Sequence, residues 1–296
     1  MLDWLTAHSL APTPRWFNFD FVMNVFTNED FFNSQLRAAR RQQLIGIGII
    51  VAFLILNCAL QFGLIGLPPV IVLIIYLLGS VAVLSGFPLW TIGNNKLKKL
   101  RSAPRSDQLL NEELKGLSNK FTLHHYVPMG GGIIKHLLVT PSGLVVMESR
   151  DDIGKVNCTS SDDGDHWKLP GGFLMRFMGD GVSTRNPSAD LEAAMGRADS
   201  LLSTIGKPNV PINGFIVFTR QNDLEIESSS RRAIPLDETK ALVKAVVFET
   251  ENDRSGEGGV TQMLTSDDRR RLNALLVPTP PPAVPTKPTN AAPRNA

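Results

Sequence analysis

Two long apolar segments dominate the hydropathy pattern of the chain. From Gln42 to Asn95 no side chain is charged. The turn-forming segment 63–69, Gly-Leu-Ile-Gly-Leu-Pro-Pro, divides this run into apolar spans at about 44–65 and 70–92. Each span has roughly the 20 residues that cross a hydrocarbon core about 30 Å thick. Because neither span has the polar face of a surface helix, we expect a two-helix transmembrane hairpin rather than two core helices of a soluble domain.

Basic residues lie at the outer ends of the two apolar spans but not in the loop that connects them. The connecting loop has no Lys or Arg, whereas both outer flanks do: Arg37, Arg40 and Arg41 before the first span, and Lys96, Lys98, Lys99, Arg101 and Arg105 after the second. Lys and Arg near membrane spans favour the cytoplasmic side. We therefore expect a multi-pass protein of the cell membrane with both termini in the cytoplasm.

The segment before the hairpin, residues 1–43, is rich in aromatic residues. Eight Trp and Phe side chains fall within the first 32 residues: Trp4, Trp16, Phe17, Phe19, Phe21, Phe26, Phe31 and Phe32. We favour a segment that lies at the membrane surface, because aromatic side chains concentrate there. Packing on the soluble domain is the alternative. Asn28 is expected to cap a helix that runs into the first span.

The region from residue 96 to 277 has the pattern of an α/β domain with a central mixed sheet. Strands are expected at 121–127, 133–140, 144–150, 153–158, near Trp167, at 214–220 and shortly before Pro235, and helices at 107–119, 188–205, 237–248 and 266–276. Pro141-Ser142-Gly143 predicts a hairpin turn that makes the strands 133–140 and 144–150 antiparallel neighbours, with Val139 close to Val145. Ser188 and Ser266 are expected helix caps. Residues 278–296 contain seven prolines and are expected to form a disordered tail.

Composition narrows the classes of function. The net charge is only +2 and charged residues make up 20% of the chain, so charge gives no support to nucleic acid as a partner. Two cysteines, Cys58 and Cys158, exclude a disulfide scaffold and a cysteine-based zinc site. The expected partners are the lipid bilayer and, through the hairpin, another protein or a second copy of the chain.

The segment 133–150, Ile-Ile-Lys-His-Leu-Leu-Val-Thr-Pro-Ser-Gly-Leu-Val-Val-Met-Glu-Ser-Arg, resembles the central hairpin of the nuclease-related domain (NERD) family. Gly154, Trp167 and Asn186-Pro187 match the same pattern, as does the apolar strand 214–218. The resemblance covers about residues 107–248. It implies a restriction-endonuclease-like core, in which an Asp on one strand and a Glu-x-Lys on the next hold Mg²⁺ and a water for phosphodiester hydrolysis, supported by a Gln on the following helix.

This chain departs from the family at most of those positions. Lys135 stands where the metal-binding Asp is expected, Arg150 where the Lys is expected, and Asp190 where the Gln is expected. Glu148 is retained, and Asp107 is a candidate replacement for an early helical Glu. A lysine ammonium opposes a divalent cation, and an arginine does not serve as a general base. We expect Lys135 to pair with Glu148 instead.

These departures favour a membrane-anchored NERD-like protein without metal-dependent nuclease activity, which binds or scaffolds at the cytoplasmic face of the membrane. No cofactor is expected. One alternative is a membrane-tethered Mg²⁺-dependent nuclease with a rearranged site built from Glu148, Asp190 and Asp107. The other is a structural subunit of a membrane assembly, held together through the hairpin.

Two further clusters have ordinary explanations. His124 and His125 point to opposite faces of their strand, and His136 on the next strand can approach only one of them. A metal pair is conceivable, but a buried or surface histidine is the better interpretation. Asp162, Asp163 and Asp165 suggest a calcium loop, but the spacing lacks the later Glu of an EF-hand, so a solvated turn is preferred.

Overall fold

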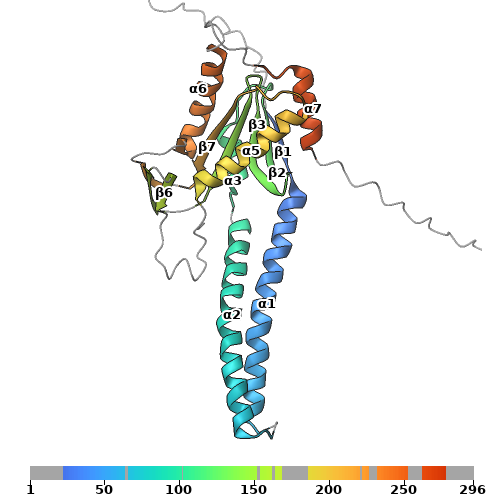
Figure 1. The fold of residues 1–296 in the computed structure, drawn as a ribbon, viewed down its shortest axis with the longest axis vertical. Helices are drawn as coiled ribbons and strands as arrows, with labels where there is room; N and C mark the ends of the chain where they lie inside the picture. Colours follow the sequence, from blue (N-terminus) through green and yellow to red (C-terminus); the bar gives the residue numbers. More distant parts are fainter. Residues whose placement is uncertain are drawn as a thin grey trace, which may run out of the picture.

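The structure is a computed structural model that describes residues 23–63, 66–101, 103–151, 154–161, 164–168, 186–220, 222–226, 232–252 and 262–277. It consists of a long helical hairpin and an α/β domain at the open end of that hairpin (Figure 1). The expectations for the aromatic residues 4–21, for Asp162 and Asp163, and for the proline-rich tail lie outside the described residues.

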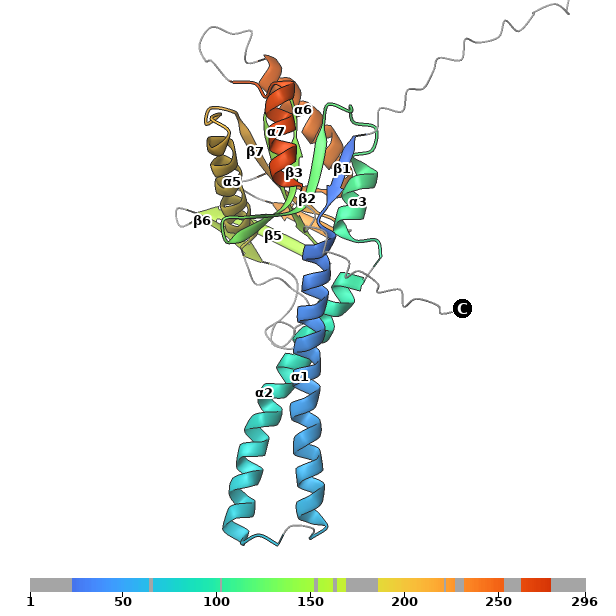
Figure 2. The same ribbon diagram turned by 90° about the vertical axis from the view of Figure 1, so that its right-hand side faces the viewer.

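The hairpin is formed by α1 (Glu29–Gln61) and α2 (Pro69–Arg101), each of 33 residues. Both are long and apolar enough to cross a membrane. At 1.5 Å per residue each helix is about 50 Å long, which exceeds a hydrocarbon core of about 30 Å. We call the ends of both helices next to the domain, residues 29–41 and 96–101, the stalk (Figure 2). As expected, Asn28 caps α1, and its side-chain oxygen accepts a hydrogen bond from Phe31 N at 3.0 Å.

Small residues at heptad spacing make the contact between α1 and α2. Ala39 and Gly46 on α1 and Gly79, Gly86 and Gly93 on α2 are all buried. The two backbones approach at Gly46, Gly86 and Gly93, whereas Gly79 makes room for the ring of Phe53. A Cβ on Gly46 would overlap the backbone of Trp90, and a Cβ on Gly93 would lie 2.5 Å from Gln43 N. Such small-residue seams are typical of helices that associate in a lipid environment.

A six-stranded mixed sheet forms the centre of the domain, which confirms the expected fold class at this level. Its strand order is β1-β2-β3-β4-β7-β9, with bounds β1 (Asn24–Thr27), β2 (Thr122–Met129), β3 (Gly132–Val139), β4 (Leu144–Arg150), β7 (Ile212–Phe218) and β9 (Arg232–Pro235). The pairs β2/β3 and β3/β4 are antiparallel, whereas β1/β2, β4/β7 and β7/β9 are parallel.

The predicted turn between β3 and β4 is present. Thr140 N donates to Gly143 O at 2.9 Å, and a Cβ on Gly143 would overlap Pro211 O, so the position requires glycine. The register pairs Val139 with Leu144 and Leu138 with Val145. The expected contact between Val139 and Val145 is therefore displaced by one residue, because the turn brings Leu144 directly opposite Val139.

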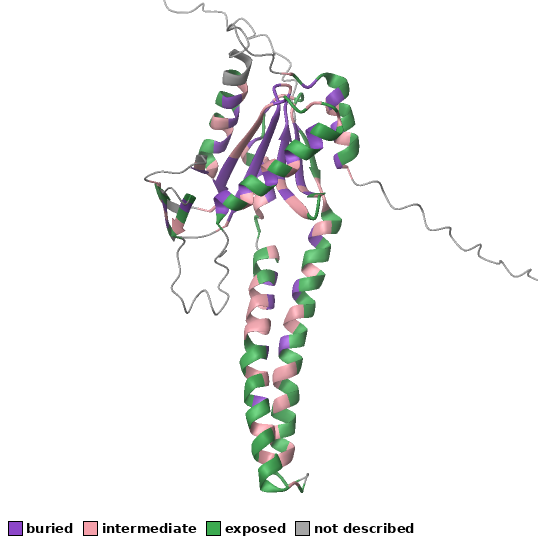
Figure 3. Ribbon diagram, in the orientation of Figure 1, coloured by how far each residue is buried: buried purple, intermediate pink, exposed green. Residues whose placement is uncertain are grey.

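Helices cover both faces of the sheet. On one face lie α5 (Pro187–Thr204) and α7 (Ser266–Leu276), and on the other lie α3 (Ser106–Glu113) and α6 (Thr239–Asn252), which follows a short 3-10 turn at Leu236–Glu238. The apolar residues of the sheet alternate between these two cores, and the sheet is the most deeply buried part of the molecule (Figure 3). A second sheet, with strand order β6-β5-β8, is made of β5 (Gly154–Ser161), β6 (Gly164–Lys168) and β8 (Asn222–Ile226).

Three local expectations need correction. The cap of α5 is Asn186, whose side chain accepts from Ser188 N and Ala189 N; Pro187 then occupies the first turn, where no backbone N–H is needed. The cap of α7 is Thr265, which exchanges hydrogen bonds with Asp268. The third concerns only residues 24–27 of the aromatic segment, because Asn24–Thr27 forms an edge strand of the main sheet and so packs on the domain, which was the alternative.

Candidate functional site

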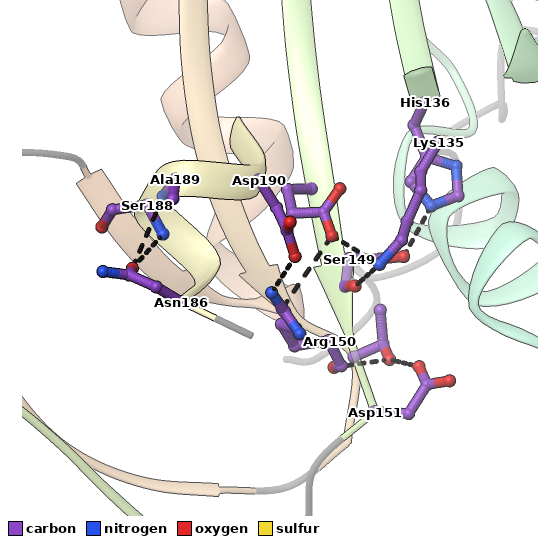
Figure 4. Close-up of polar contacts among 11 residues, drawn as sticks. Lys135, His136, Ser149, Arg150, Asp151, Asn186, Ser188, Ala189 and Asp190 are labelled. Carbon is purple, nitrogen blue, oxygen red and sulfur yellow. Dashed lines mark hydrogen bonds and ion pairs between the residues drawn. The ribbon is translucent and has the colours of Figure 1, made fainter. Parts of the chain in front are cut away.

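The residues singled out by the family resemblance lie where β3, β4 and α5 meet (Figure 4). Lys135 is on β3, Glu148 and Arg150 are on β4, and Asp190 is in the first turn of α5. Glu148 and Arg150 are two residues apart on one strand, so both side chains point to the α5 face of the sheet. Each of these two residues is only 4% exposed.

Lys135 and Glu148 form the ion pair that the sequence predicted. Lys135 Nζ lies 2.5 Å from Glu148 Oε1 and donates a hydrogen bond to the backbone oxygen of Ser149 at 2.9 Å. Glu148 Oε1 is buried and accepts no hydrogen bond, so the contact with Lys135 lacks hydrogen-bond geometry although the two atoms are close. It is therefore an electrostatic contact.

Arg150 contacts the same carboxylate oxygen from its place on β4. Its Nε is 3.9 Å from Glu148 Oε1, and its Nη2 donates to Asp190 Oδ2 at 2.7 Å. Asp190 is thus held by a guanidinium and does not point freely into a metal site. Lys135, Glu148, Arg150 and Asp190 form one alternating row of charges, which we call the charge row. A row of this kind stabilises its own members, because each carboxylate contacts at least one cation.

Asp107, the third carboxylate of the rearranged-site alternative, does not join the charge row. It lies on α3, on the opposite face of the sheet, and Arg105 binds both of its oxygens, with Nε at 3.0 Å and Nη2 at 2.7 Å. Burial alone would lower the pKa of Arg105, but the hydrogen bond and charge of Asp107 and the charge of Glu29 outweigh it, and the pKa is raised. In the part of the chain that the structure describes, no group of three His, Cys, Asp or Glu side chains is placed to hold a metal ion.

The α3 face of the sheet carries a second polar group, a buried histidine pair. His125 Nδ1 and His136 Nδ1 are 2.6 Å apart, so His136 approaches His125 rather than His124. The outer nitrogens contact Asn111 Oδ1 at 2.9 Å and Ser149 Oγ at 2.8 Å. Burial lowers the pKa of His125 to about 4, and burial together with the neighbouring charge lowers the pKa of His136 well below its ordinary value. The pair is neutral at pH 7.

His124 belongs to the other face. Its Nε2 contacts Asn273 Oδ1 on α7 at 2.9 Å, and its ring stacks on Phe26 of β1. Burial lowers its pKa, although the hydrogen bond to Asn273 opposes the effect. The expectation that neighbouring histidines point to opposite faces is therefore confirmed, and both faces use them as buried structural groups.

Two residues near the charge row were not expected from the sequence. Ser149 links the two faces: its backbone oxygen accepts from Lys135, while its hydroxyl contacts His136. Tyr126 has a positive φ of 57° on β2, stacks on Phe31 of α1, and accepts a hydrogen bond from Asn28 at its backbone oxygen. Tyr126 therefore ties the stalk to the sheet. Alternation along β4 could have indicated Ser149, but nothing local indicates the bend at Tyr126.

Comparisons with protein-family models, with curated proteins and with solved structures give no match for this chain. The geometry of the described residues therefore carries the functional argument.

Proposed function

We propose that this chain is a membrane-anchored protein whose NERD-like domain binds a partner or ligand at the cytoplasmic face and does not cleave nucleic acid. The observation that carries the anchor is the outward face of the hairpin. Large apolar side chains there are widely exposed, among them Ile55 at 65%, Leu73 at 70% and Leu84 at 74%. A contiguous apolar surface of this extent is unfavourable in water and is typical of a membrane-facing surface.

The charges of the stalk give the orientation of the proposed anchor. α1 begins at the domain and α2 ends there. The parts of both helices next to the domain carry seven cations: Arg37, Arg40, Arg41, Lys96, Lys98, Lys99 and Arg101. If the apolar band lies in the bilayer, all of them stand on the same side of it. The preference of Lys and Arg for the cytoplasmic side then supports a cytoplasmic location for the domain.

The charge row supports binding rather than cleavage. A nuclease of this type needs carboxylates that are open to Mg²⁺ and a basic group that activates water. Here Glu148 contacts Lys135, and Asp190 contacts Arg150. Placing Mg²⁺ at Glu148 would require displacement of a cation, and the pKa of an arginine is too high for a general base.

The two alternatives find less support. The rearranged nuclease needs Asp107 beside Glu148 and Asp190, but Asp107 is bound by Arg105 on the opposite face of the sheet. A structural subunit would need a free helix-packing surface, but the glycines at Gly46, Gly79, Gly86 and Gly93 already pack within the hairpin.

The orientation is tested by cysteine labelling in a Cys58→Ser background. A cysteine at Gly66, in the loop, is expected to react with a membrane-impermeant maleimide added to intact cells. A cysteine at Lys98, in the stalk, is expected to react only after the membrane is opened. The reverse pattern would overturn the orientation.

The absence of cleavage is tested with the full chain purified in detergent. It is expected neither to bind Mg²⁺ at millimolar concentration in a calorimetric titration nor to cut DNA or RNA with Mg²⁺ or Mn²⁺. The combined variant Lys135→Asp, Arg150→Lys is expected to gain metal binding. If the unaltered chain cleaves nucleic acid and Glu148→Ala abolishes this cleavage, the binding proposal is wrong and the rearranged nuclease replaces it.

A further inference from the structure

A pocket of about 280 Å³ lies where the stalk meets the sheet domain. Its walls come from α1, the end of α2 and the start of α3. The sheet contributes residues of β2, β3 and β4, and the segments that follow β4 and β7 complete the wall. The lining residues include Phe32, Lys96, Lys99, Arg105, Tyr126, Lys135, Ser149, Asp151 and Arg220. The pocket thus begins at the outer end of the charge row and opens toward the stalk.

Most of the charged side chains that line this pocket are cationic. Among the described residues that line it, five side chains are cationic and one, Asp151, is a carboxylate. Three carboxylates behind the lining offset part of this charge, because Glu29 and Asp107 contact Arg105 and Glu148 contacts Lys135. Polar groups of Ser106, Tyr126 and Ser149 are also present in the wall.

The pocket is held by contacts that fix the stalk on the domain. The Arg105 guanidinium lies over the ring of Phe32 at 4.2 Å, and Phe31 stacks on Tyr126. The hydrogen bond from Asn28 Nδ2 to the Tyr126 backbone oxygen, at 3.3 Å, joins the start of α1 to β2. These contacts pre-form the site, so a ligand need not order it.

The position along α2 places the pocket near a membrane surface, provided that the hairpin spans the bilayer. Lys96 follows the last uncharged residue of the apolar run, Asn95. At 1.5 Å per residue, Lys96 and Lys99 lie within about 6 Å of Asn95, where the uncharged stretch ends. That is about the depth of the headgroup layer. Basic pockets beside membrane helices on the cytoplasmic side are suited to phosphorylated headgroups.

We propose that this pocket binds a phosphomonoester dianion, supplied either by a lipid headgroup or by a soluble phosphate compound. Lys96 and Lys99 reach the ligand from α2, and Lys135 and Arg220 hold it from the sheet. The volume is just below the range of about 300–1,000 Å³ that is typical of small-molecule pockets, which suits a phosphate with a small carrier group. A second cavity, of about 580 Å³, lies on the α7 side of the junction, but its walls are mainly apolar and include the carboxylate Asp30.

The lipid-headgroup form of this inference rests on the proposed membrane anchor, whereas the soluble form does not. Two measurements on the full chain separate the sources. Native mass spectrometry in detergent, with equal amounts of phosphatidic acid and phosphatidylglycerol, reports whether a phosphomonoester lipid is retained preferentially. Calorimetric titration with inorganic phosphate reports the soluble form.

The variant Lys96→Gln, Lys99→Gln is expected to weaken whichever binding is observed by about tenfold or more, since each Lys near an anionic headgroup contributes about 1 kcal/mol. Lys98→Gln is the matched control. Lys98 lies between the two on the same helix and does not line the pocket, so it alters the general charge of the stalk but not the site. Both lysines of the double variant are exposed, so the fold is expected to be unaffected.

Preferential retention of phosphatidic acid that the double variant loses supports the lipid source, and phosphate binding that it loses supports the soluble source. If neither probe binds, or if Lys98→Gln weakens binding as much as the double variant, the pocket is not a phosphomonoester site. Either failure leaves the cysteine-labelling result unchanged. The inference and the proposed anchor can therefore fail independently.

Discussion

The hairpin and the sheet domain place polar and apolar side chains in opposite ways. In the hairpin the large apolar side chains face outward, while glycines form the contact between the two helices. In the domain the large apolar side chains fill two cores, and the charged residues Glu148 and Arg150 lie inside, each 4% exposed. The two arrangements suit different surroundings, because helices in lipid associate by close packing and domains in water associate by burying apolar surface.

The polar groups of the two regions follow the same division. Two hydrogen bonds between side chains of α1 and α2 join neutral groups: Tyr76 donates to Asn57 Oδ1 at 3.1 Å, and Gln43 donates to Asn94 Oδ1 at 3.5 Å. In the domain, charged groups contact one another directly. The cost of a disruption should therefore depend on which region contains it, and on whether the altered group is buried.

Loss of a buried charge in the domain should give the largest effect. Arg150→Ala removes the cation between Glu148 and Asp190, and we expect the free energy of unfolding to fall by about 3–5 kcal/mol, since carboxylates lose a buried partner. Urea unfolding of the full chain in detergent, followed by near-ultraviolet circular dichroism, measures this loss.

The matched control for Arg150→Ala is Lys155→Ala. Lys155 pairs with Glu225 at the surface, where the two side chains are 55% and 48% exposed. Removal of an exposed pair should cost less than about 1 kcal/mol. Equal losses for the two variants would show that the charge row is not a buried network.

Acid should weaken the domain through the buried histidine pair. The pKa of His125 is lowered to about 4, and that of His136 is lowered well below its ordinary value, in both cases chiefly by burial. Between pH 6.5 and 4 the unfolded chain therefore binds more protons than the folded chain, and stability falls as the pH falls. The expected slope is about 1.4 kcal/mol per pH unit for each histidine.

Unfolding measured at pH 7, 6 and 5 checks this slope, and the variant His125→Gln should show a shallower one. A stability that is constant over this range would mean that the histidines are not buried as a neutral pair.

The pKa of Asp268 is also lowered, because hydrogen bonds from Thr265 and the charge of Lys207 outweigh the effect of burial. This carboxyl titrates below the pH window used here.

Crowding of the hairpin seam should have the smallest of the three effects. Gly46→Leu places a side chain against the backbone of Trp90, and we expect a loss of about 1–3 kcal/mol in the stability of the helix pair. Gly48→Leu is the control, since nothing lies within 4 Å of a Cβ at Gly48. Unfolding in mixed detergent micelles compares the two, and a similar loss for both would place the seam elsewhere.

The sequence predicted those features that depend on local pattern. The two apolar helices, the turn at Pro141-Ser142-Gly143, the antiparallel pair β3/β4 and the contact of Lys135 with Glu148 are all present. The last of these followed because the two residues lie on strands joined by a short turn. Periodicity and turn chemistry act over a few residues, so one sequence is enough to detect them.

Features that depend on distant pairing were missed. β1 has four residues and gains its place only by pairing with β2, about a hundred residues later, so Phe26 was grouped with the aromatic segment before the hairpin. Asp107 was grouped with Glu148 although α3 packs on the opposite face of the sheet. The contact between Arg150 and Asp190 depends on how α5 docks on β4. The helix caps were each placed too late, at Ser188 instead of Asn186 and at Ser266 instead of Thr265.

In the proposed arrangement the outward face of the hairpin contacts lipid while the stalk contacts water. Nitroxide labels at Ile55→Cys and Leu77→Cys, in a Cys58→Ser chain reconstituted in phosphatidylcholine vesicles, test it most directly. We predict that power-saturation measurements show more frequent collisions with oxygen than with a water-soluble nickel chelate at both positions. A label at Lys98→Cys should show the reverse. Collisions with the nickel chelate that are as frequent at residues 55 and 77 as at residue 98 would contradict the claim.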